Sequence, residues 1–89
     1  MPVVIVPPPL QGPTAGVGRV EVAAETVRGT LERMEGDYPG FGELVLEANG
    51  ELSSFVKIFR NGEQVDPGSL DQEVAAADEL EVVTAIAGG

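Results

Sequence analysis

The spacing of the apolar residues switches from strand-like to helical and back along the chain, and this order limits the folds that the chain can adopt. Polar and apolar residues alternate over 19–23, which is typical of a strand with one buried face. Over 26–38 the apolar residues recur every three or four positions, as they do on one face of a helix. Over 55–60 the residues again follow the strand pattern, in which successive side chains point to opposite faces. This order predicts an α+β fold in which one helix packs on one face of a sheet.

The N-terminal region predicts a β-hairpin. Residues 2–6 form a run rich in valine and isoleucine that begins with a proline, which is typical of a strand. Residues 7–18 hold four prolines and three glycines, so we expect a loop there rather than a strand or a helix. This loop leads into the alternating segment 19–23, where Val20 and Val22 are expected to face the core.

The C-terminal half predicts a second hairpin and a final strand. Residues 55–60 form the strongest strand pattern, and Asn61-Gly62 directly after them is a typical two-residue hairpin turn. Residues 63–65 would then be the return strand. Residues 80–84 are expected to form the last strand. The sheet should therefore be mixed and contain four to five strands.

Residues 26–38 predict the one main helix, with Thr26 as its N-cap and its end near Tyr38. The apolar stripe that is expected to pack in the core comprises Val27, Leu31, Met34 and Tyr38. Gly29 costs about 1 kcal/mol relative to alanine inside a helix, so we expect it to allow close packing against the sheet. Residues 41–52 are expected to form a short helical turn and a loop.

The composition removes most kinds of enzyme chemistry. The 89 residues suffice for one domain, and its core is expected to be aliphatic because 43% of the residues are hydrophobic and only 4% aromatic. Cysteine and histidine are both absent, which excludes disulfides, thiolate metal sites, thiol nucleophiles and imidazole acid–base catalysis. The sequence also lacks a glycine-rich phosphate loop with its lysine. We therefore expect no cofactor or metal bound by this chain, and any ATP site should belong to a partner.

The net charge of −10 favours protein partners. Nucleic acids and anionic membrane surfaces are expected to be poor partners, because phosphate binding needs clustered lysine and arginine. A basic protein face is a better match, although acidity alone also keeps a small protein soluble. The sequence has no apolar run long enough to span a bilayer and no signal-peptide pattern at its start, so we expect a cytoplasmic protein.

Residues 85–89 end in two glycines and predict a functional tail. Glycine has no Cβ, so Gly88 and Gly89 form a thin strip that could thread a narrow channel and bring the Gly89 carboxylate to the nucleotide site of a partner enzyme. We therefore divide the chain into a domain at 1–84 and a flexible tail at 85–89. A frayed terminus without function is the alternative interpretation.

A docking surface is expected on the outer face of the sheet. Alternation puts Val56 and Ile58 on one side and Phe55, Lys57 and Phe59 on the other, and lysine marks the second side as the one that faces water. Alternation in the last strand likewise directs Glu81 and Val83 outward. Phe59 and Val83 are therefore our candidate contacts for a partner protein, with Lys57 and Glu81 at the rim, and Phe59 is expected to be exposed. An ordinary surface residue is the alternative interpretation of Phe59.

Four local patterns follow one another in the order known from one protein family. They are the loop Val6-Pro7-Pro8-Pro9-Leu10 with Pro13-Thr14-Ala15-Gly16, the helix frame Thr26-Val27 with Tyr38-Pro39-Gly40, the hairpin Phe55-Val56 with Asn61-Gly62-Glu63, and the last strand and tail Asp78-Glu79-Leu80 through Ala87-Gly88-Gly89. Together they resemble the ubiquitin-like β-grasp sulfur carriers of the MoaD/ThiS family over the whole chain. Within it, the loop and the tail look closest to CysO-type carriers, which supply sulfur for cysteine synthesis.

The resemblance implies that an E1-like enzyme adenylates the Gly89 carboxylate with ATP and magnesium, and that sulfur then displaces AMP to leave a thiocarboxylate. A sulfur-accepting synthase would use this sulfur to make cysteine, thiamine or another metabolite, so the chain would be a protein cosubstrate rather than an enzyme. Ile86 and Ala87 would anchor the base of the tail in the partner, and Gly88 would give access to the terminus.

Two other functions fit the same family resemblance. The chain could be the small subunit of molybdopterin synthase, which would bind a large partner stably. It could also be a ubiquitin-like modifier whose activated Gly89 forms an isopeptide bond with a lysine. A further alternative does not use the chemistry of this family: a module that only binds other molecules and whose C-terminus is chemically inert.

Overall fold

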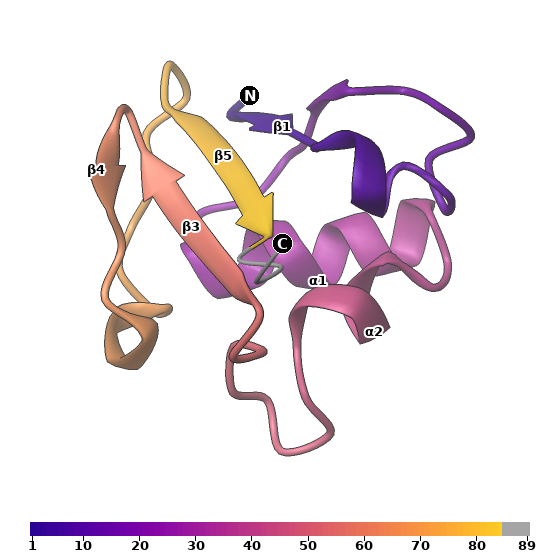
Figure 1. Ribbon diagram of the computed structural model, residues 1–89. Helices are drawn as coiled ribbons and strands as arrows, with labels where there is room; N and C mark the ends of the chain where they lie inside the picture. Colours follow the sequence, from indigo (N-terminus) through magenta and orange to yellow (C-terminus); the bar gives the residue numbers. More distant parts are fainter. Residues whose placement is uncertain (85–89) are drawn as a thin grey trace.

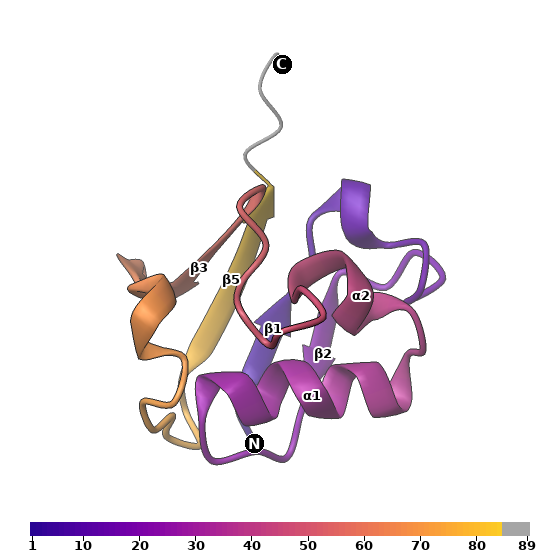
Figure 2. The same cartoon turned by 90° about the horizontal axis from the view of Figure 1, so that it is seen from below.

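Residues 1–84 of the computed structural model form a mixed five-stranded sheet in the order β2-β1-β5-β3-β4, and the two α-helices cover one face of it (Figures 1 and 2). The elements in chain order are β1 (Val3–Ile5), the 3-10 helix η1 (Pro8–Leu10), β2 (Arg19–Glu21), α1 (Val27–Asp37), α2 (Phe41–Val45), β3 (Val56–Arg60), β4 (Glu63–Gln64), the 3-10 helix η2 (Pro67–Ser69) and β5 (Glu79–Thr84). Residues 85–89 lie outside the described part of the chain. The expected α+β fold of the ubiquitin-like β-grasp type is confirmed.

The strand β5 lies in the middle of the sheet. It pairs parallel with β1 and antiparallel with β3. The strands β1 and β2 form the antiparallel hairpin that the sequence predicts, with Val4 opposite Val20. Parallel strands need a long connection between them, and the segment that contains α1 and α2 supplies it. Figure 2 shows both helices on the same side of β1 and β5.

The loop between β1 and β2 is more regular than expected. It contains the short helix η1, whose prolines already have the φ angle that a helical turn needs. The loop is closed by Thr14, whose hydroxyl donates to the carbonyl of Val17 at 2.7 Å. The prediction of a loop without any helical turn was therefore wrong for Pro8–Leu10, although the segment does connect the two strands of the hairpin.

The helix α1 begins as its sequence predicts. The side chain of Thr26 accepts a hydrogen bond from the backbone N–H of Gly29 at 2.9 Å, which is the usual N-cap contact. The helix ends at Asp37, with Tyr38 as its C-cap. Gly29 itself does not pack against the sheet as expected. A Cβ at this position would lie 3.0 Å from the Thr26 hydroxyl oxygen, so the glycine leaves room for the N-cap.

The second hairpin also follows its local sequence. Asn61 has a φ of 51° and Gly62 a φ of 88°, which is the combination that a tight two-residue hairpin turn requires. The segment 41–52 forms the short helix α2 and a loop, as predicted, and the loop is closed by a bridge between Leu46 and Leu52. Among residues 1–84, no helix is both long and apolar enough to cross a membrane.

The core lies between the inner face of the sheet and the two helices. Its buried apolar residues are Val4, Val6, Leu10, Val20, Val22, Val27, Leu31, Met34, Phe41, Val45, Leu52, Val56, Ile58, Val65, Leu70, Leu80 and Val82. The apolar stripe of α1 is therefore a core surface, as expected, except that Tyr38 at its end is only partly buried. Within the described residues Phe41 is the one aromatic residue of this core, so the expected aliphatic core is confirmed.

Candidate partner-docking site

The strand β5 ends at Thr84, and in the sequence the tail follows directly from it. Its last residue, Thr84, lies opposite Val56 at the start of β3. Figure 1 shows the end of β5 beside the start of β3. The tail residues with predicted roles lie outside the described part of the chain: Ile86, Ala87, Gly88 and Gly89. Their roles therefore stay predictions.

The outer face of the sheet brings the four predicted docking residues together. In the antiparallel pair of β3 and β5, Phe59 lies opposite Glu81 and Lys57 lies opposite Val83. Phe59 and Val83 are thus diagonal neighbours on one face, a separation that an aromatic side chain can span. Both are half-buried, whereas Lys57 and Glu81 are exposed. The expectation that Phe59 is exposed was wrong: it is half-buried, on a strand that has a neighbour on both sides, with Gln64 and Glu81 opposite it.

This face continues onto β1, which the sequence did not indicate. Ile5 is half-buried and lies opposite Glu81 in the parallel pair, so it is on the same face as Phe59. Its other neighbour is Arg19 on β2, which forms an exposed ion pair with Glu79 at 3.3 Å. The docking face therefore has apolar residues on three adjacent strands and charged residues between them. Knowledge of the strand order would have placed Ile5 on this face. The alternation of polar and apolar residues within one strand does not give that order.

The start of β5 is held by the carboxylate of Asp78. It accepts hydrogen bonds from the backbone N–H of Ala75 at 2.7 Å, the side-chain amide of Asn61 at 2.8 Å and Nε of Arg60 at 2.9 Å. These contacts favour the ionised form, and the hydrogen bond from Ala75 contributes most to holding the pKa of Asp78 below its ordinary value. The turn of the β3–β4 hairpin is thereby tied to the end of β5 that is farther from the tail.

An exposed aromatic residue lies at the opposite end, close to the level of Thr84, the last residue of β5. Phe55 directly precedes Val56, and 66% of its surface is exposed, more than for any other large hydrophobic residue among those described. Its backbone is held in a turn, because the N–H of Val56 donates to the carbonyl of Ser53 at 3.0 Å. The sequence predicted that Phe55 would lie on the solvent side, and this is confirmed, but it assigned no role to Phe55.

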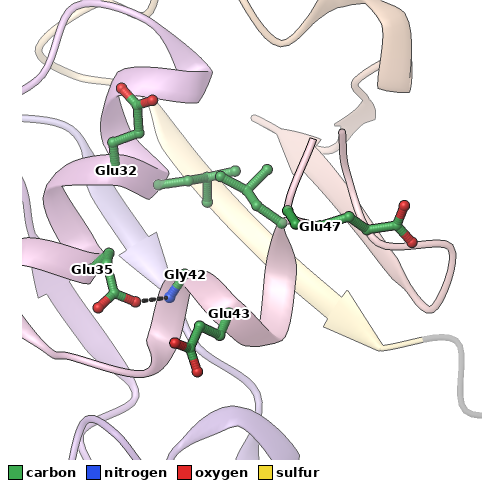
Figure 3. A pocket seen from close by; sticks show the side chains of 8 residues that line it. Glu32, Glu35, Gly42, Glu43 and Glu47 are labelled. Atoms are coloured by element: carbon green, nitrogen blue, oxygen red, sulfur yellow. Dashed lines mark hydrogen bonds between the residues drawn. The ribbon is translucent and has the colours of Figure 1, made fainter. Parts of the chain in front are cut away.

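A hollow of about 690 Å³ lies between α1 and α2, on the helical side of the molecule (Figure 3). Its lining includes Glu32, Glu43 and Glu47, whose carboxylates point away from one another, and within the described residues it contains no lysine or arginine. Glu35 instead points at the start of α2 and accepts a hydrogen bond from the N–H of Gly42 at 2.8 Å. Such a surface repels nucleotides and other anions.

Metal-binding groups are not assembled in the part of the chain that the structure describes. Within residues 1–84, no three or more aspartate and glutamate side chains are placed so that they could hold an ion.

Comparison with known proteins gives one family. The family model described as the ThiS family matches residues 14–89. A protein of Archaeoglobus fulgidus that is named as an inferred sulfur carrier is 44% identical over 48 residues, which are 53% of this chain and 54% of that protein. This chain therefore spans about half the length of the curated relative that it matches.

The solved structures cover the whole domain. CysO of Mycobacterium tuberculosis has a TM-score of 0.88 and 27% identity, over 97% of this chain and 100% of that chain. CysO from a complex with BexX of Amycolatopsis orientalis has a TM-score of 0.91 and 29% identity, over 100% of both chains. SAMP1 of Haloferax volcanii has a TM-score of 0.77 and 28% identity, over 99% of this chain and 98% of that chain. The predicted resemblance to CysO-like carriers is confirmed, and the chain belongs to the ThiS family of ubiquitin-like sulfur carriers.

Proposed function

We propose that this protein carries sulfur as a thiocarboxylate on Gly89 and acts as a cosubstrate of other enzymes. The observation that carries the proposal is the reach of the family match, which extends through the tail to residue 89. The sequence contains no cysteine, so no side chain could hold a thioester or a persulfide instead. The expected cytoplasmic location is part of the same proposal.

The chemistry has two steps, both performed in a partner enzyme. A carboxylate oxygen of Gly89 attacks the α-phosphorus of ATP, and pyrophosphate leaves with its magnesium. Sulfide then attacks the carbonyl carbon of the acyl-adenylate and AMP leaves, so that sulfur replaces one oxygen. Adenylation is needed because a free carboxylate is a poor acyl donor. The acidic lining of the hollow between α1 and α2 supports placing the ATP site in the activating partner.

The outer sheet face would dock this activating enzyme. Phe59, Val83 and Ile5 supply apolar contacts, while Lys57 and Glu81 supply charge at the edge of the patch. The similarity to CysO in its complex with BexX supports a carrier that works while bound to another protein. The sulfur-accepting synthase would receive the thiocarboxylate in a later, separate complex. It would build the sulfur into cysteine, thiamine or another metabolite.

The test is the intact mass of the protein after incubation with ATP, magnesium, sulfide and candidate activating enzymes. We expect a mass gain equal to the replacement of one oxygen by sulfur, and no gain in a variant that lacks Gly88 and Gly89. A mass that stays unchanged with the enzymes that thiolate other ThiS-family carriers would refute the proposal. Stable co-purification with a large subunit would indicate a molybdopterin synthase subunit instead.

The docking face is tested separately by substitution of Phe59. Phe59→Lys places an ammonium group opposite Glu81, so the cross-strand pair is favourable and the fold should remain intact. Phe59→Glu would place two carboxylates opposite each other and confound the result. We expect Phe59→Lys to weaken binding to the activating enzyme about tenfold or more, as for the loss of an apolar interface residue. An unchanged affinity would remove Phe59 from the interface.

A protein modifier is the second candidate, because the small archaeal modifier protein 1 of Haloferax volcanii has 28% identity to this chain and a TM-score of 0.72. In that case activated Gly89 would be attacked by the amine of a lysine and form an isopeptide bond. Conjugates that survive denaturation, and that disappear when Gly88 and Gly89 are removed, would establish this function. Their absence together with the sulfur-dependent mass gain would exclude it in favour of sulfur transfer.

A further inference from the structure

The turn that carries Phe55 is built to present its ring to solvent. The backbone N–H of Phe55 donates to the hydroxyl oxygen of Ser53 at 3.3 Å, and the N–H of Ser53 donates to the carbonyl of Val45 at 2.8 Å. The turn is therefore tied to the end of α2 on one side and to β3 on the other. A large aromatic ring on a backbone that is already ordered loses little entropy when a partner covers it.

The position of Phe55 relative to the tail sets it apart from Phe59. The register of β3 and β5 puts Val56 opposite Thr84, so Phe55 is one residue beyond the level at which β5 ends. Phe59 lies four residues farther along β3, about 13 Å away along the strand. A partner that binds the domain where β5 ends is therefore nearer to Phe55 than to Phe59.

The nearby charge also suits a protein contact. Lys57 is exposed on the neighbouring β3 position, opposite Val83, in a chain whose net charge is −10. Aromatic residues are enriched at the centre of protein interfaces and charged residues lie at the rim, so Phe55 suits the centre of a contact and Lys57 suits its edge. The described part of the chain leaves 66% of the Phe55 surface exposed.

We propose that Phe55 is an aromatic anchor that inserts into an apolar recess beside the entrance of the activating enzyme's tail-binding channel. This inference rests on the proposed function. Phe55 acts as a positioning residue, because it fixes where the end of β5 meets the enzyme and takes no part in the chemistry at Gly89. The activating enzyme is the occupant, since adenylation is the first step in which the tail must enter a channel.

The test measures steady-state thiocarboxylation with the activating enzyme that produces the mass gain in the unchanged protein. We expect Phe55→Ala to raise the KM for the carrier about 30-fold, equivalent to about 2 kcal/mol, with kcat roughly unchanged, as for loss of a contact made throughout the reaction. Phe55→Leu keeps an apolar side chain and should restore most of the affinity. The unfolding midpoints of all variants should match that of the unchanged protein.

Leu44→Ala is the matched control, because Leu44 is also an exposed large apolar residue, at 43%, but lies on α2. Its KM should stay unchanged. The inference is overturned if Phe55→Ala and Leu44→Ala have the same KM, or if the effect of Phe55→Ala is accompanied by a loss of stability. If the unchanged protein gains no sulfur, the proposed function is refuted, and the inference about Phe55 is refuted with it. If the unchanged protein gains sulfur but Phe55→Ala does not raise the KM, only the inference about Phe55 is refuted.

Discussion

Val82 and Val83 are adjacent on β5 and have identical side chains, yet they face opposite sides of the sheet. Val82 is only 1% exposed and belongs to the core, whereas Val83 is half-buried on the docking face opposite Lys57. Substitution of each by alanine removes the same atoms from two different environments. The pair should therefore separate the stability of the fold from the affinity for the activating enzyme.

The cost of Val82→Ala can be worked out from its burial. Removal of two buried methyl groups costs about 1.6 kcal/mol in lost transfer free energy, at about 0.8 kcal/mol each. The cavity that remains adds about 1 kcal/mol, because a packed core relaxes only partly. The total of about 2.5 kcal/mol should lower the thermal midpoint of a domain of this size by roughly 10–20 °C. Val83→Ala should cost less than about 1 kcal/mol, since its side chain already contacts water.

The assay combines urea denaturation of both variants with the KM for thiocarboxylation, measured well below both thermal midpoints. Val83→Ala should raise the KM about fivefold, equivalent to about 1 kcal/mol of lost apolar contact. Val82→Ala should leave the KM unchanged once the protein is folded. Equal losses of stability for the two variants would refute the assignment of the two faces, and an unchanged KM for Val83→Ala would remove Val83 from the docking site.

Two further predictions concern the fold that supports this site. Gly42→Ala should destabilise the protein by about 2 kcal/mol in urea denaturation, because its Cβ would lie 2.9 Å from Glu35 and displace the carboxylate from the start of α2. Gly36→Ala, with nothing within 4 Å, should instead stabilise it by about 0.5 kcal/mol, and equal effects would contradict this reasoning. Asp78→Asn should destabilise the protein at neutral pH and flatten its loss of stability on acidification. The pKa of Asp78 is lowered in the folded state, so its contribution is present above the unfolded value of 3.8 and disappears as the pH falls through the folded value. Urea midpoints at neutral pH and about pH 3 measure this, and an equal acid-induced loss in both proteins would disprove it.

Features with a local cause were predictable from the sequence. The Thr26 N-cap and the Asn61-Gly62 turn each depend on the chemistry of a few consecutive residues, and both occur where the sequence places them. The alternation in 55–60 likewise assigned Val56 and Ile58 to the core correctly. For the cap and the turn, the deciding contact lies within a few residues along the chain. For Val56 and Ile58, the local alternation identifies the core face, although the residues that bury them are distant in the sequence.

Features with a distant cause were not predictable in this way. The burial of part of Phe59 depends on Gln64 and Glu81, which flank it on the neighbouring strands, and alternation alone does not identify these neighbours. The same holds for Ile5, which joins the docking face only because β1 lies beside β5. The environments of Phe59 and Ile5 therefore differ from the sequence-based expectation because both depend on strand order. Strand order in turn depends on the packing of the whole domain.

The central place of β5 would give the tail a fixed point of origin in the proposed function. The inner residues of β5 lie in the core, its outer residues lie in the docking face, and Asp78 ties its first turn to the β3–β4 hairpin. Glu81, at the level of Phe59, is three residues from Thr84, about 10 Å along the strand. An enzyme that binds the outer face therefore meets the origin of the tail at a fixed distance, because one paired strand connects the two. In the proposed function, recognition of the outer face and delivery of the terminus would be coupled through β5, which is paired with β1 on one side and β3 on the other.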